Sequence, residues 1–420
     1  MSEARVSTRS EDGSVQTWDA ETIQRLLSGP ARVAQGWVPG PPANKPVISL
    51  AAGVPDAPTF PVAEVGAAVR TVLAREASSA LEYLLGTPGG IRELRELVIE
   101  RMEPEPGVAL SAANVSITSG SAQAFANICQ TLLDPGDTVV IEAPTYAGAI
   151  RAAQGSAARF AGVPMDEQGM RTDLLAETLE RLERAGERPK FIYTIPTFHN
   201  PSGTTMTVER RRQLIEIAAR QRVLIVEDDA YGELRYRGEP LPSVFSLANG
   251  EGVLRCGTVS KTIAPGLRVG WIKGPQPIID ALVRMRFDNG TSPFAQLIVR
   301  AYVEAGAYEP HVAVVRDVYK RKFEAMDAAL GEHLSQVARW TDPDGGFFIW
   351  VTLPEGVDCM TLQPLAWDEG VSFYPGPAFF MNEGGEGHLR LAFSAVRQEL
   401  IGEGVARLGR ALARAAGRSA

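Results

Sequence analysis

Short segments that are apolar throughout alternate with amphipathic segments in the middle of the chain, and this alternation constrains the fold more than any other feature. The segments expected to form strands are residues 115–118, 138–142, 191–195, 223–226 and 254–258. Between them, residues 121–133 have the apolar spacing of a helix, and Thr207 is placed to cap another. Strands without a polar face need cover on both sides. The pattern therefore predicts an α/β fold with a mainly parallel sheet between helix layers.

The pattern changes at both ends of this region. Residues 1–45 are expected to form an N-terminal arm with a short helix at 20–27. From about residue 310 a long helix, short strands and a final helix replace the alternation, with strands expected at 346–351, 371–374 and 388–393. We therefore predict a large domain over residues 46–305 and a smaller α+β domain over residues 306–420.

Composition narrows the functional classes. A net charge of -8 argues against nucleic-acid binding. No apolar run approaches the length of a transmembrane helix, and residues 1–15 contain no hydrophobic signal region, so we expect a cytoplasmic protein without a membrane partner. Three cysteines and four histidines show neither disulfide nor metal-ligand spacing, and no metal site is predicted.

Lys261 lies in a stretch of small and apolar residues, seven positions before Arg268. The chain contains six lysines against thirty-six arginines, so a lysine here is not a generic choice of positive charge. Only an amine that loses its proton can form a Schiff base, which indicates a nucleophilic lysine. The segment resembles the coenzyme-binding segment of pyridoxal phosphate enzymes with the aspartate aminotransferase fold, type I.

A candidate phosphate site follows the strand at 115–118. Ser121 and Ala122 begin the next helix, where backbone N–H groups and the helix dipole favour an anion. The cofactor phosphate carries about two negative charges near neutral pH. Arg268 and the hydroxyl groups of Thr258 and Ser260 could complete the site, whereas a surface salt bridge is an equally good interpretation of Arg268 alone.

Acidic residues follow the apolar strand at 223–226. Burying a carboxylate at the end of an apolar strand destabilises the fold unless the carboxylate has a partner. A pyridinium nitrogen would be such a partner for Asp228. Tyr231 could donate a hydrogen bond to the ring oxygen. A helix-capping role is the alternative for one of the adjacent acids, and Asp229 is the better candidate for it.

Three more side chains are candidates for the same site. Asn200, in a turn-forming segment, could contact the ring oxygen and the substrate carboxylate, and Tyr146 could stack on the ring. Arg390 lies between apolar residues of a short strand and could bind an α-carboxylate through two hydrogen bonds. A simple turn, a core aromatic and an outward-facing edge residue are the respective structural alternatives.

In combination, these motifs are similar to those of fold-type I, class I/II aminotransferases. The nearest subgroup acts on 2-aminoadipate, kynurenine and other aromatic or aliphatic amino acids. The resemblance runs from Leu50 to the C-terminal helix and is carried most clearly by residues 200–203, 260–268 and 374–380. It implies a seven-stranded large-domain sheet and a homodimer whose active sites are shared.

The resemblance also implies a mechanism. Pyridoxal 5'-phosphate would be held by Lys261 as a Schiff base, and an L-amino acid and a 2-oxo acid would exchange an amino group through a quinonoid intermediate. Lys261, Asp228 and Tyr231 would be catalytic, and Gly53, Asn200 and Arg390 would bind substrate. The N-terminal arm would help to shape the small domain and the substrate pocket.

One departure from the family pattern concerns a tyrosine that reaches the phosphate of the partner subunit. Leu85 stands at its expected position, and Tyr83 lies two residues earlier, on the same side of an extended segment. Either Tyr83 replaces the usual contact or the contact is absent.

Two other functions remain open. Elimination, replacement, cyclisation or oxidation in specialised biosynthesis would use the same catalytic residues, and the departure at Leu85 is a hint in that direction. A transcription regulator with an aminotransferase-like domain is a distant alternative, because the first 45 residues show no helix-turn-helix pattern. Arg25, Arg32 and Trp37 of the arm could line the pocket, whereas solvated residues of a mobile segment are the favoured interpretation.

Overall fold

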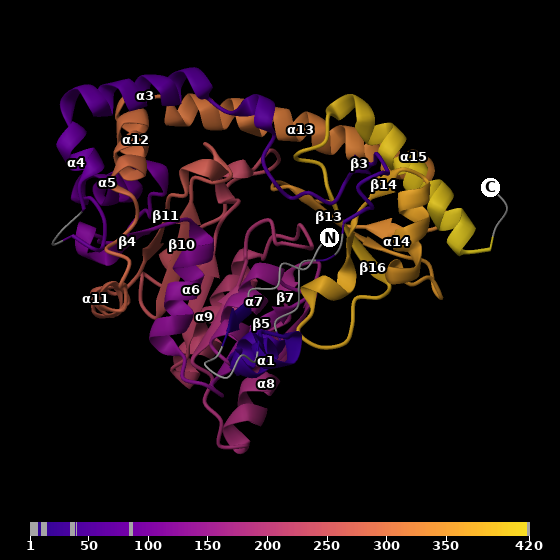
Figure 1. Ribbon diagram of the computed structural model, residues 1–420, viewed down its shortest axis with the longest axis horizontal. Helices are drawn as coiled ribbons and strands as arrows, with labels where there is room; N and C mark the ends of the chain where they lie inside the picture. Colours follow the sequence, from indigo (N-terminus) through magenta and orange to yellow (C-terminus); the bar gives the residue numbers. More distant parts are fainter. Residues whose placement is uncertain (1–6, 10–14, 34–37, 39, 84–86, 418–420) are drawn as a thin grey trace.

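The computed structural model describes residues 7–9, 15–33, 38, 40–83 and 87–417 (Figure 1). The described residues form a central sheet of eight strands in the order β4-β11-β10-β9-β8-β5-β6-β7. Its strands are β4 (Val115–Thr118), β5 (Thr138–Ala143), β6 (Arg159–Asp166), β7 (Gly169–Met170), β8 (Phe191–Thr194), β9 (Leu224–Asp228), β10 (Val253–Thr258) and β11 (Gly270–Lys273). Five adjacent strands from β6 to β10 are parallel, whereas β7 and β11 pair antiparallel. The mainly parallel sheet is confirmed, with the two-residue β7 added at its edge.

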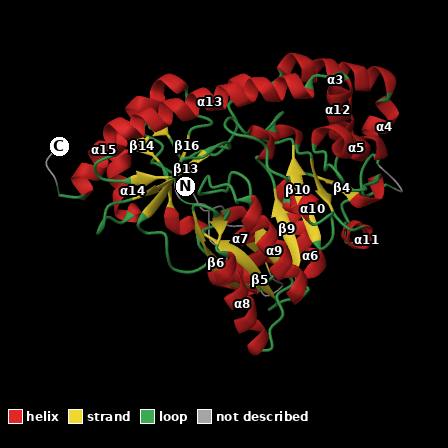
Figure 2. Cartoon of the chain, turned by 180° about the vertical axis from the view of Figure 1, so that it is seen from behind, coloured by secondary structure: helices red, strands yellow, loops and turns green. Residues whose placement is uncertain are grey.

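Helices cover both faces of this sheet (Figure 2). One layer consists of α6 (Ser121–Leu132), α7 (Ala147–Gly155) and α11 (Gln276–Arg284), and the other of α8 (Thr172–Arg184), α9 (Val208–Gln221) and α10 (Val244–Leu247). On β5, Val139 and Ile141 pack with the first layer, whereas Val140 packs with the second. Strands that are apolar throughout are the consequence of this double burial. Helix α9 is capped as predicted, because the Thr207 side chain accepts a hydrogen bond from the Arg210 N–H.

A third group of helices lies against the β4 edge: α3 (Val62–Arg75), α4 (Ala77–Leu81), α5 (Arg92–Leu97) and α12 (Pro293–Glu304). The arm contains β1 (Ser7–Arg9), β2 (Val15–Thr17), α1 (Ala20–Leu26) and α2 (Gly29–Val33). Short 3-10 helices span Ala57–Thr59, Ala112–Asn114, Gly232–Leu234, Pro265–Leu267 and Gly376–Phe379, and a π-helical turn spans Val98–Met102.

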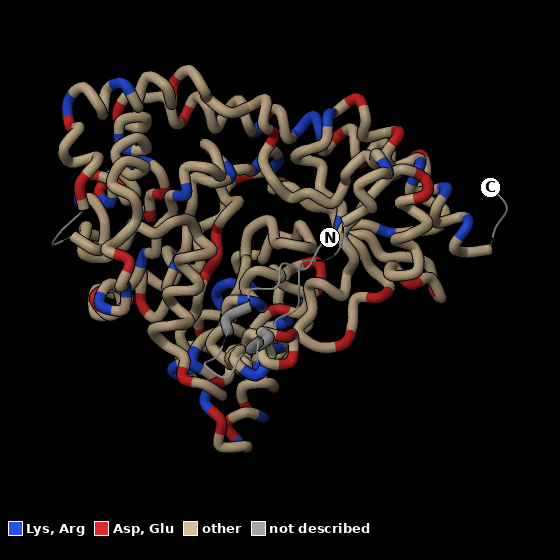
Figure 3. The backbone as a smooth tube through the Cα atoms, viewed as in Figure 1, with Lys and Arg blue, Asp and Glu red and all other residues tan. Residues whose placement is uncertain are grey.

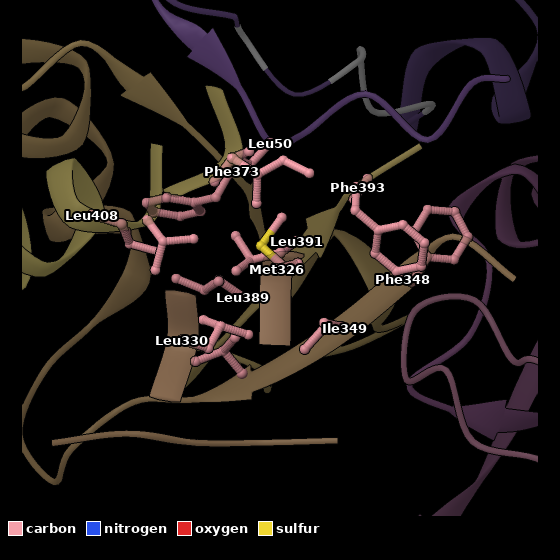
Figure 4. Packing of buried hydrophobic residues seen from close by; sticks show 14 of the residues in the cluster. Leu50, Met326, Leu330, Phe348, Ile349, Phe373, Leu389, Leu391, Phe393 and Leu408 are labelled. Carbon is pink, nitrogen blue, oxygen red and sulfur yellow. The ribbon is translucent and has the colours of Figure 1, made fainter. Parts of the chain in front are cut away.

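The C-terminal part packs around a separate core. Helix α13 (Tyr308–His333) begins beside α12 and ends in this core, together with α14 (Cys359–Asp368) and α15 (Gln398–Ala415). Its sheet has the order β12-β13-β16-β15, formed by Arg339–Trp340, Phe348–Thr352, His388–Ala392 and Tyr374–Pro375. Figure 4 shows how Leu330, Leu389 and Leu408 meet between these elements.

A distant segment joins this C-terminal core. Strand β3 (Ile48–Ser49) pairs with β14 (Val371–Ser372), and Leu50 is fully buried in the core (Figure 4). The single strand expected at 371–374 is wrong, because Val371–Ser372 pairs with β3 whereas Tyr374–Pro375 pairs with β16. The segment that follows Leu50 therefore starts from the C-terminal core.

Charged residues of both signs are interspersed along the backbone (Figure 3). Within the described ranges, no helix combines the length and apolarity needed to cross a membrane. The same residues contain no cluster of three or more His, Cys, Asp or Glu side chains that could hold a metal ion.

Candidate active site

A cavity of about 390 Å³ lies where the carboxyl ends of β8, β9 and β10 face the C-terminal core. All twelve residues predicted from sequence to bind cofactor or substrate within one subunit line it: Gly53, Ser121, Ala122, Tyr146, Asn200, Asp228, Tyr231, Thr258, Ser260, Lys261, Arg268 and Arg390. Open parallel sheets bind ligands at this edge, because loops and helix N-termini meet there. The roles of these residues stay predictions, but the fold brings them together.

Lys261 follows β10 and is the nucleophile candidate of the cavity. Its Nζ lies 3.4 Å from the Gly53 carbonyl oxygen and 5.7 Å from the centre of the Tyr231 ring. Burial, with the nearby charges of Arg390 and Arg268, lowers the pKa of Lys261 to about 8, while Asp228 acts in the opposite direction. A substantial fraction of this amine is therefore neutral at slightly alkaline pH.

The cavity contains an anion cradle at the start of α6. Gly120, with φ of 88°, precedes the helix, and a Cβ added there would lie 2.6 Å from Arg268 Nη2. Arg268 Nη2 donates to the Ser119 carbonyl at 2.8 Å, which holds the guanidinium across the first turn of the helix. The Thr258 hydroxyl lies 2.9 Å from Ser260 Oγ, which in turn lies 3.4 Å from Arg268 Nη1. Unpaired N–H groups of a first helical turn, an arginine and two hydroxyl groups match the donor set of a phosphate site.

Asp228 ends β9 and is nearly fully buried. Its Oδ2 accepts a hydrogen bond from the Tyr193 hydroxyl at 2.7 Å, whereas its Oδ1 has no hydrogen-bond partner among the described residues. Burial raises the pKa of Asp228 to about 6, and the hydrogen bond from Tyr193 opposes this rise. A buried acceptor without a donor at the wall of a cavity indicates a ligand donor at this point.

Arg390 lies at the other end of the cavity on β16, between β13 and β15, so it is not an edge residue. Its Nη1 donates to Asn200 Oδ1 at 2.9 Å and its Nη2 to the Ala51 carbonyl at 2.8 Å. The guanidinium lies 4.2 to 5.0 Å from the ring centres of Phe348, Tyr374 and Phe379. Burial lowers the pKa of Arg390 to about 10, so the group remains a cation. It has no anionic partner among the residues that the structure describes and can therefore bind a carboxylate.

Two tyrosines flank the space between Lys261 and Arg390. Tyr146 immediately precedes α7, and Tyr231 packs edge-on against Phe348 with ring centres 5.5 Å apart. Burial raises the pKa of both phenols, so each hydroxyl stays protonated and can donate a hydrogen bond.

Asp229, the neighbour of Asp228, faces away from this cavity. Its Oδ1 accepts the Gly232 N–H at 2.8 Å, but the N-cap residue of the 3-10 helix Gly232–Leu234 is Tyr231, so Asp229 is not the helix cap that we expected. It also forms a buried ion pair with Arg255.

Tyr83 does not line the cavity and is 76% exposed. Its predicted contact with a partner subunit is therefore not a contact within one chain and stays a prediction. Leu85 and Trp37 lie outside the described residues, and Arg25 and Arg32 do not line the cavity.

Two features of the site were not predicted from the sequence: the apolar wall of the cavity, and Tyr193, which contacts Asp228 from the side opposite the cavity. The cavity is also lined by Ala51, Ala52, Val54, Ala147, Ile195, Ala230, Phe348, Tyr374 and Phe379. Tyr374 and Phe379 belong to a motif that carried the family resemblance, so position alone could have suggested them. Tyr193 had no such signal, because an apolar strand with one tyrosine is typical of a core.

The comparisons with known proteins agree with this geometry. The sequence model of the family "Aminotransferase class I and II" matches residues 45–408. Aromatic-amino-acid aminotransferase 1 of Thermococcus litoralis is 41% identical over 364 residues, which cover 86% of this chain and 87% of that protein.

Solved structures show the same likeness in three dimensions. The multiple substrate aminotransferase of Thermococcus profundus superposes with a TM-score of 0.87 at 37% identity, over 94% of this chain and 100% of the other. The α-aminoadipate aminotransferase of Thermus thermophilus, complexed with N-(5'-phosphopyridoxyl)-L-leucine, superposes with a TM-score of 0.82 at 35% identity, over 95% and 98%.

Proposed function

This chain belongs to the class I and II aminotransferases, which move amino groups between amino acids and 2-oxo acids with pyridoxal phosphate. We propose that its amino donors are L-amino acids with uncharged aromatic or aliphatic side chains. One observation carries the choice. Among the described residues that line the cavity, the only cations are Lys261, Arg268 and Arg390, and each has a role in holding the cofactor or the α-carboxylate. Phe348, Tyr374 and Phe379 leave an aromatic wall for the side chain.

The cavity fits the cofactor at three points. The Gly120 cradle with Arg268 suits the phosphate, the unpaired Asp228 Oδ1 suits a protonated ring nitrogen, and the Lys261 amine suits an aldehyde. When bound, pyridoxal phosphate supplies an aldehyde that condenses with amines and a ring that withdraws electrons from the substrate Cα.

The residues of the chain then divide the work. Arg390 and Asn200 bind the α-carboxylate and orient the substrate, so that its Cα faces Lys261. Lys261 Nζ would take the proton from Cα as a general base. Asp228 would hold a proton on the ring nitrogen, Tyr231 would donate to the ring oxygen, and Tyr146 would cover a ring face, since all three line the cavity.

Absorbance spectroscopy of the cofactor-loaded protein tests this function. Mixed with a panel of amino acids and no 2-oxo acid, it should release one 2-oxo acid per site with aromatic and aliphatic donors and far less with acidic ones. Lys261→Ala should abolish turnover, and Lys320→Ala, at an exposed lysine, should not change it. Repeated turnover without an acceptor would instead reveal an elimination, replacement or oxidation.

We further propose that the enzyme is a homodimer with shared active sites. Leu81, Tyr83, Met285 and Phe287 are between 51% and 90% exposed, which is unusual for large apolar side chains. The loop at 286–291 lies beside the phosphate cradle, because Asp288 accepts a hydrogen bond from Gln123 and Thr291 lies 3.4 Å from Ser119 Oγ. A second copy covering these residues would bring Tyr83 to the partner's cradle.

Subunit complementation tests the shared site. Tyr83→Ala and Lys261→Ala variants, each impaired alone, should regain activity when mixed and reassembled, because half of the sites in a mixed dimer carry neither change. Sedimentation of a monomer, or no recovery after mixing, would contradict the arrangement.

We also propose a cytoplasmic location. The three cysteines, Cys129, Cys256 and Cys359, are buried and unpaired, which suits a reducing compartment. Measuring free thiols in protein isolated without reductant checks this expectation.

A further inference from the structure

Tyr193 lies directly behind Asp228 and takes no part in the reaction described above. It is fully buried on β8, and it is not among the described residues that line the cavity. Its ring packs against Phe125 with centres 4.6 Å apart, and its backbone pairs with Ile141 of β5 and Val226 of β9. The hydroxyl is therefore held by strands and packing rather than by any ligand.

The hydrogen bond from Tyr193 makes the two oxygens of Asp228 unequal. Oδ2 accepts from the Tyr193 hydroxyl at 2.7 Å, which leaves Oδ1 as the oxygen available to a ligand. A neutral donor stabilises a carboxylate relative to the carboxylic acid, whereas burial has the opposite effect. Tyr193 thus counteracts the tendency of the buried group to take up a proton.

We propose that Tyr193 is a positioning residue that acts through Asp228 to keep the shared proton on the ring nitrogen of the bound cofactor instead of on the carboxyl group. The inference rests on the proposed role of Asp228. A cationic ring withdraws electrons from the substrate Cα better than a neutral one, so Tyr193 supports the proton removal by Lys261. The other ionisable groups that influence Asp228, or are influenced by it, are Asp229, Lys261, Glu142, Tyr146, Tyr231 and Cys256.

The direct test is nitrogen-15 solid-state NMR of the holoenzyme loaded with ring-labelled pyridoxal phosphate. In the unaltered enzyme the ring nitrogen should give the resonance of a protonated pyridine. In Tyr193→Phe, which keeps the ring and removes only the hydroxyl, the resonance should move toward that of neutral pyridine. Replacing Tyr193 with 3-fluorotyrosine, a more acidic phenol and hence a stronger donor, should keep the protonated signal over a wider pH range.

Kinetics give a second readout. Tyr193→Phe should lower kcat by at least about tenfold with little change in KM, since a hydrogen bond to a charged group is lost. The deuterium isotope effect from an α-deuterated substrate should increase, because the step at Cα slows. Tyr302→Phe is the matched control: Tyr302 is equally buried, its hydroxyl has no hydrogen-bond partner among the described residues, and it lies on α12 away from the cavity. This control should change neither the resonance nor kcat.

The Asp228→Asn variant distinguishes a failure of the role proposed for Tyr193 from a failure of the role proposed for Asp228. If Asp228→Asn moves the resonance and Tyr193→Phe does not, the inference about Tyr193 is overturned while the proposed function stands. If neither variant moves it, Asp228 does not hold the ring nitrogen, and the role given to Asp228 fails together with the inference. Unchanged thermal unfolding of Tyr193→Phe shows that the strand has kept its structure.

Discussion

Two consecutive carboxylates, Asp228 and Asp229, are both nearly fully buried at the end of β9 yet have opposite surroundings. Asp228 faces the cavity with a neutral tyrosine on one oxygen and, within the described part of the chain, no partner on the other. Asp229 has both oxygens occupied, one by the Gly232 N–H and one by the Arg255 guanidinium. The first is poised to bind a ligand, and the second is already satisfied by the protein.

Asp229 belongs to an ion-pair network, which we define as Glu103, Glu105, Glu227, Asp229, Arg255 and Lys273. Lys273 is fully buried and lies 2.7 Å from a Glu103 oxygen and 2.6 Å from a Glu105 oxygen. Breaking a buried ion pair lowers the stability of the folded state, whereas a buried carboxylate without a cation already destabilises it. The comparison therefore indicates that stability resides in the network and reactivity in its neighbour.

Among the changes that test this comparison, Arg255→Met should lower the free energy of unfolding most. The change leaves Glu103 and Glu105 with Lys273 as their remaining cation and removes the cation paired with Asp229, and removing one member of a buried pair typically costs about 3–5 kcal/mol. Urea unfolding of the cofactor-free protein at fixed concentration measures the loss. A loss below about 1 kcal/mol would mean that the network does not stabilise the sheet.

Asp228→Asn should show the reverse pattern. We expect kcat to fall about a hundredfold, which corresponds to about 2.7 kcal/mol, because the ring nitrogen loses its anion. The free energy of unfolding should stay the same or increase, since an uncompensated buried charge is removed. Asp229→Asn is the matched control, with lower stability as its main effect. Equal losses of activity and stability in both variants would erase the distinction.

Acidification should change the stability contributions of Asp228 and of the ion-pair network in opposite directions. The pKa of Asp228 is raised to about 6 from 3.8, so the folded protein binds more protons than the unfolded chain between these values. Its contribution to stability is present below pH 4 and is lost as pH rises through 6, at about 1 kcal/mol for each pH unit. Burial acts to raise the pKa of Glu105, but Arg255 and Lys273 lower it overall, so its contribution is present above the unfolded pKa and is lost as pH falls.

Unfolding measurements between pH 3 and pH 7 on three proteins check these signs. Relative to Asp228→Asn, the unaltered protein should gain stability as the pH falls from 6 to 4. Relative to Glu105→Gln, it should lose stability in the acid range. If both differences in unfolding free energy changed with pH in the same direction, the proposed contrast between Asp228 and the ion-pair network would be contradicted.

The sequence predicted the parts of this molecule that depend on short motifs. Lys261 and Asp228 follow apolar strands, and the carboxyl ends of parallel strands meet, so their proximity was predictable. Tyr193 was not, because its contact with Asp228 depends on the register between β8 and β9 and on which face the side chain takes. Strand β11, which brings Lys273 to the network, runs antiparallel to β10 and was not among the strands expected from the sequence. The roles of Tyr83 and Leu85 depend on a second subunit, which one sequence does not place.

The smallest effect is expected from Glu103→Gln. The network contains four carboxylates around two cations, so removing one negative charge leaves Arg255 and Lys273 with enough partners. Glutamine can still accept the hydrogen bond that the Trp271 Nε1–H donates at 2.8 Å, and the Glu103 backbone carbonyl keeps its own contact with Lys273. We therefore expect the free energy of unfolding to fall by less than about 1 kcal/mol. Glu105→Gln should cost more, because Glu105 accepts a direct hydrogen bond from Arg255, whereas Glu103 lies 3.5 Å from that guanidinium, and because Glu105 also accepts from Ser243 at 2.7 Å. If Glu103→Gln proved as costly as Arg255→Met, the network would hold no excess of negative charge, and the individual pairs would matter more than their sum.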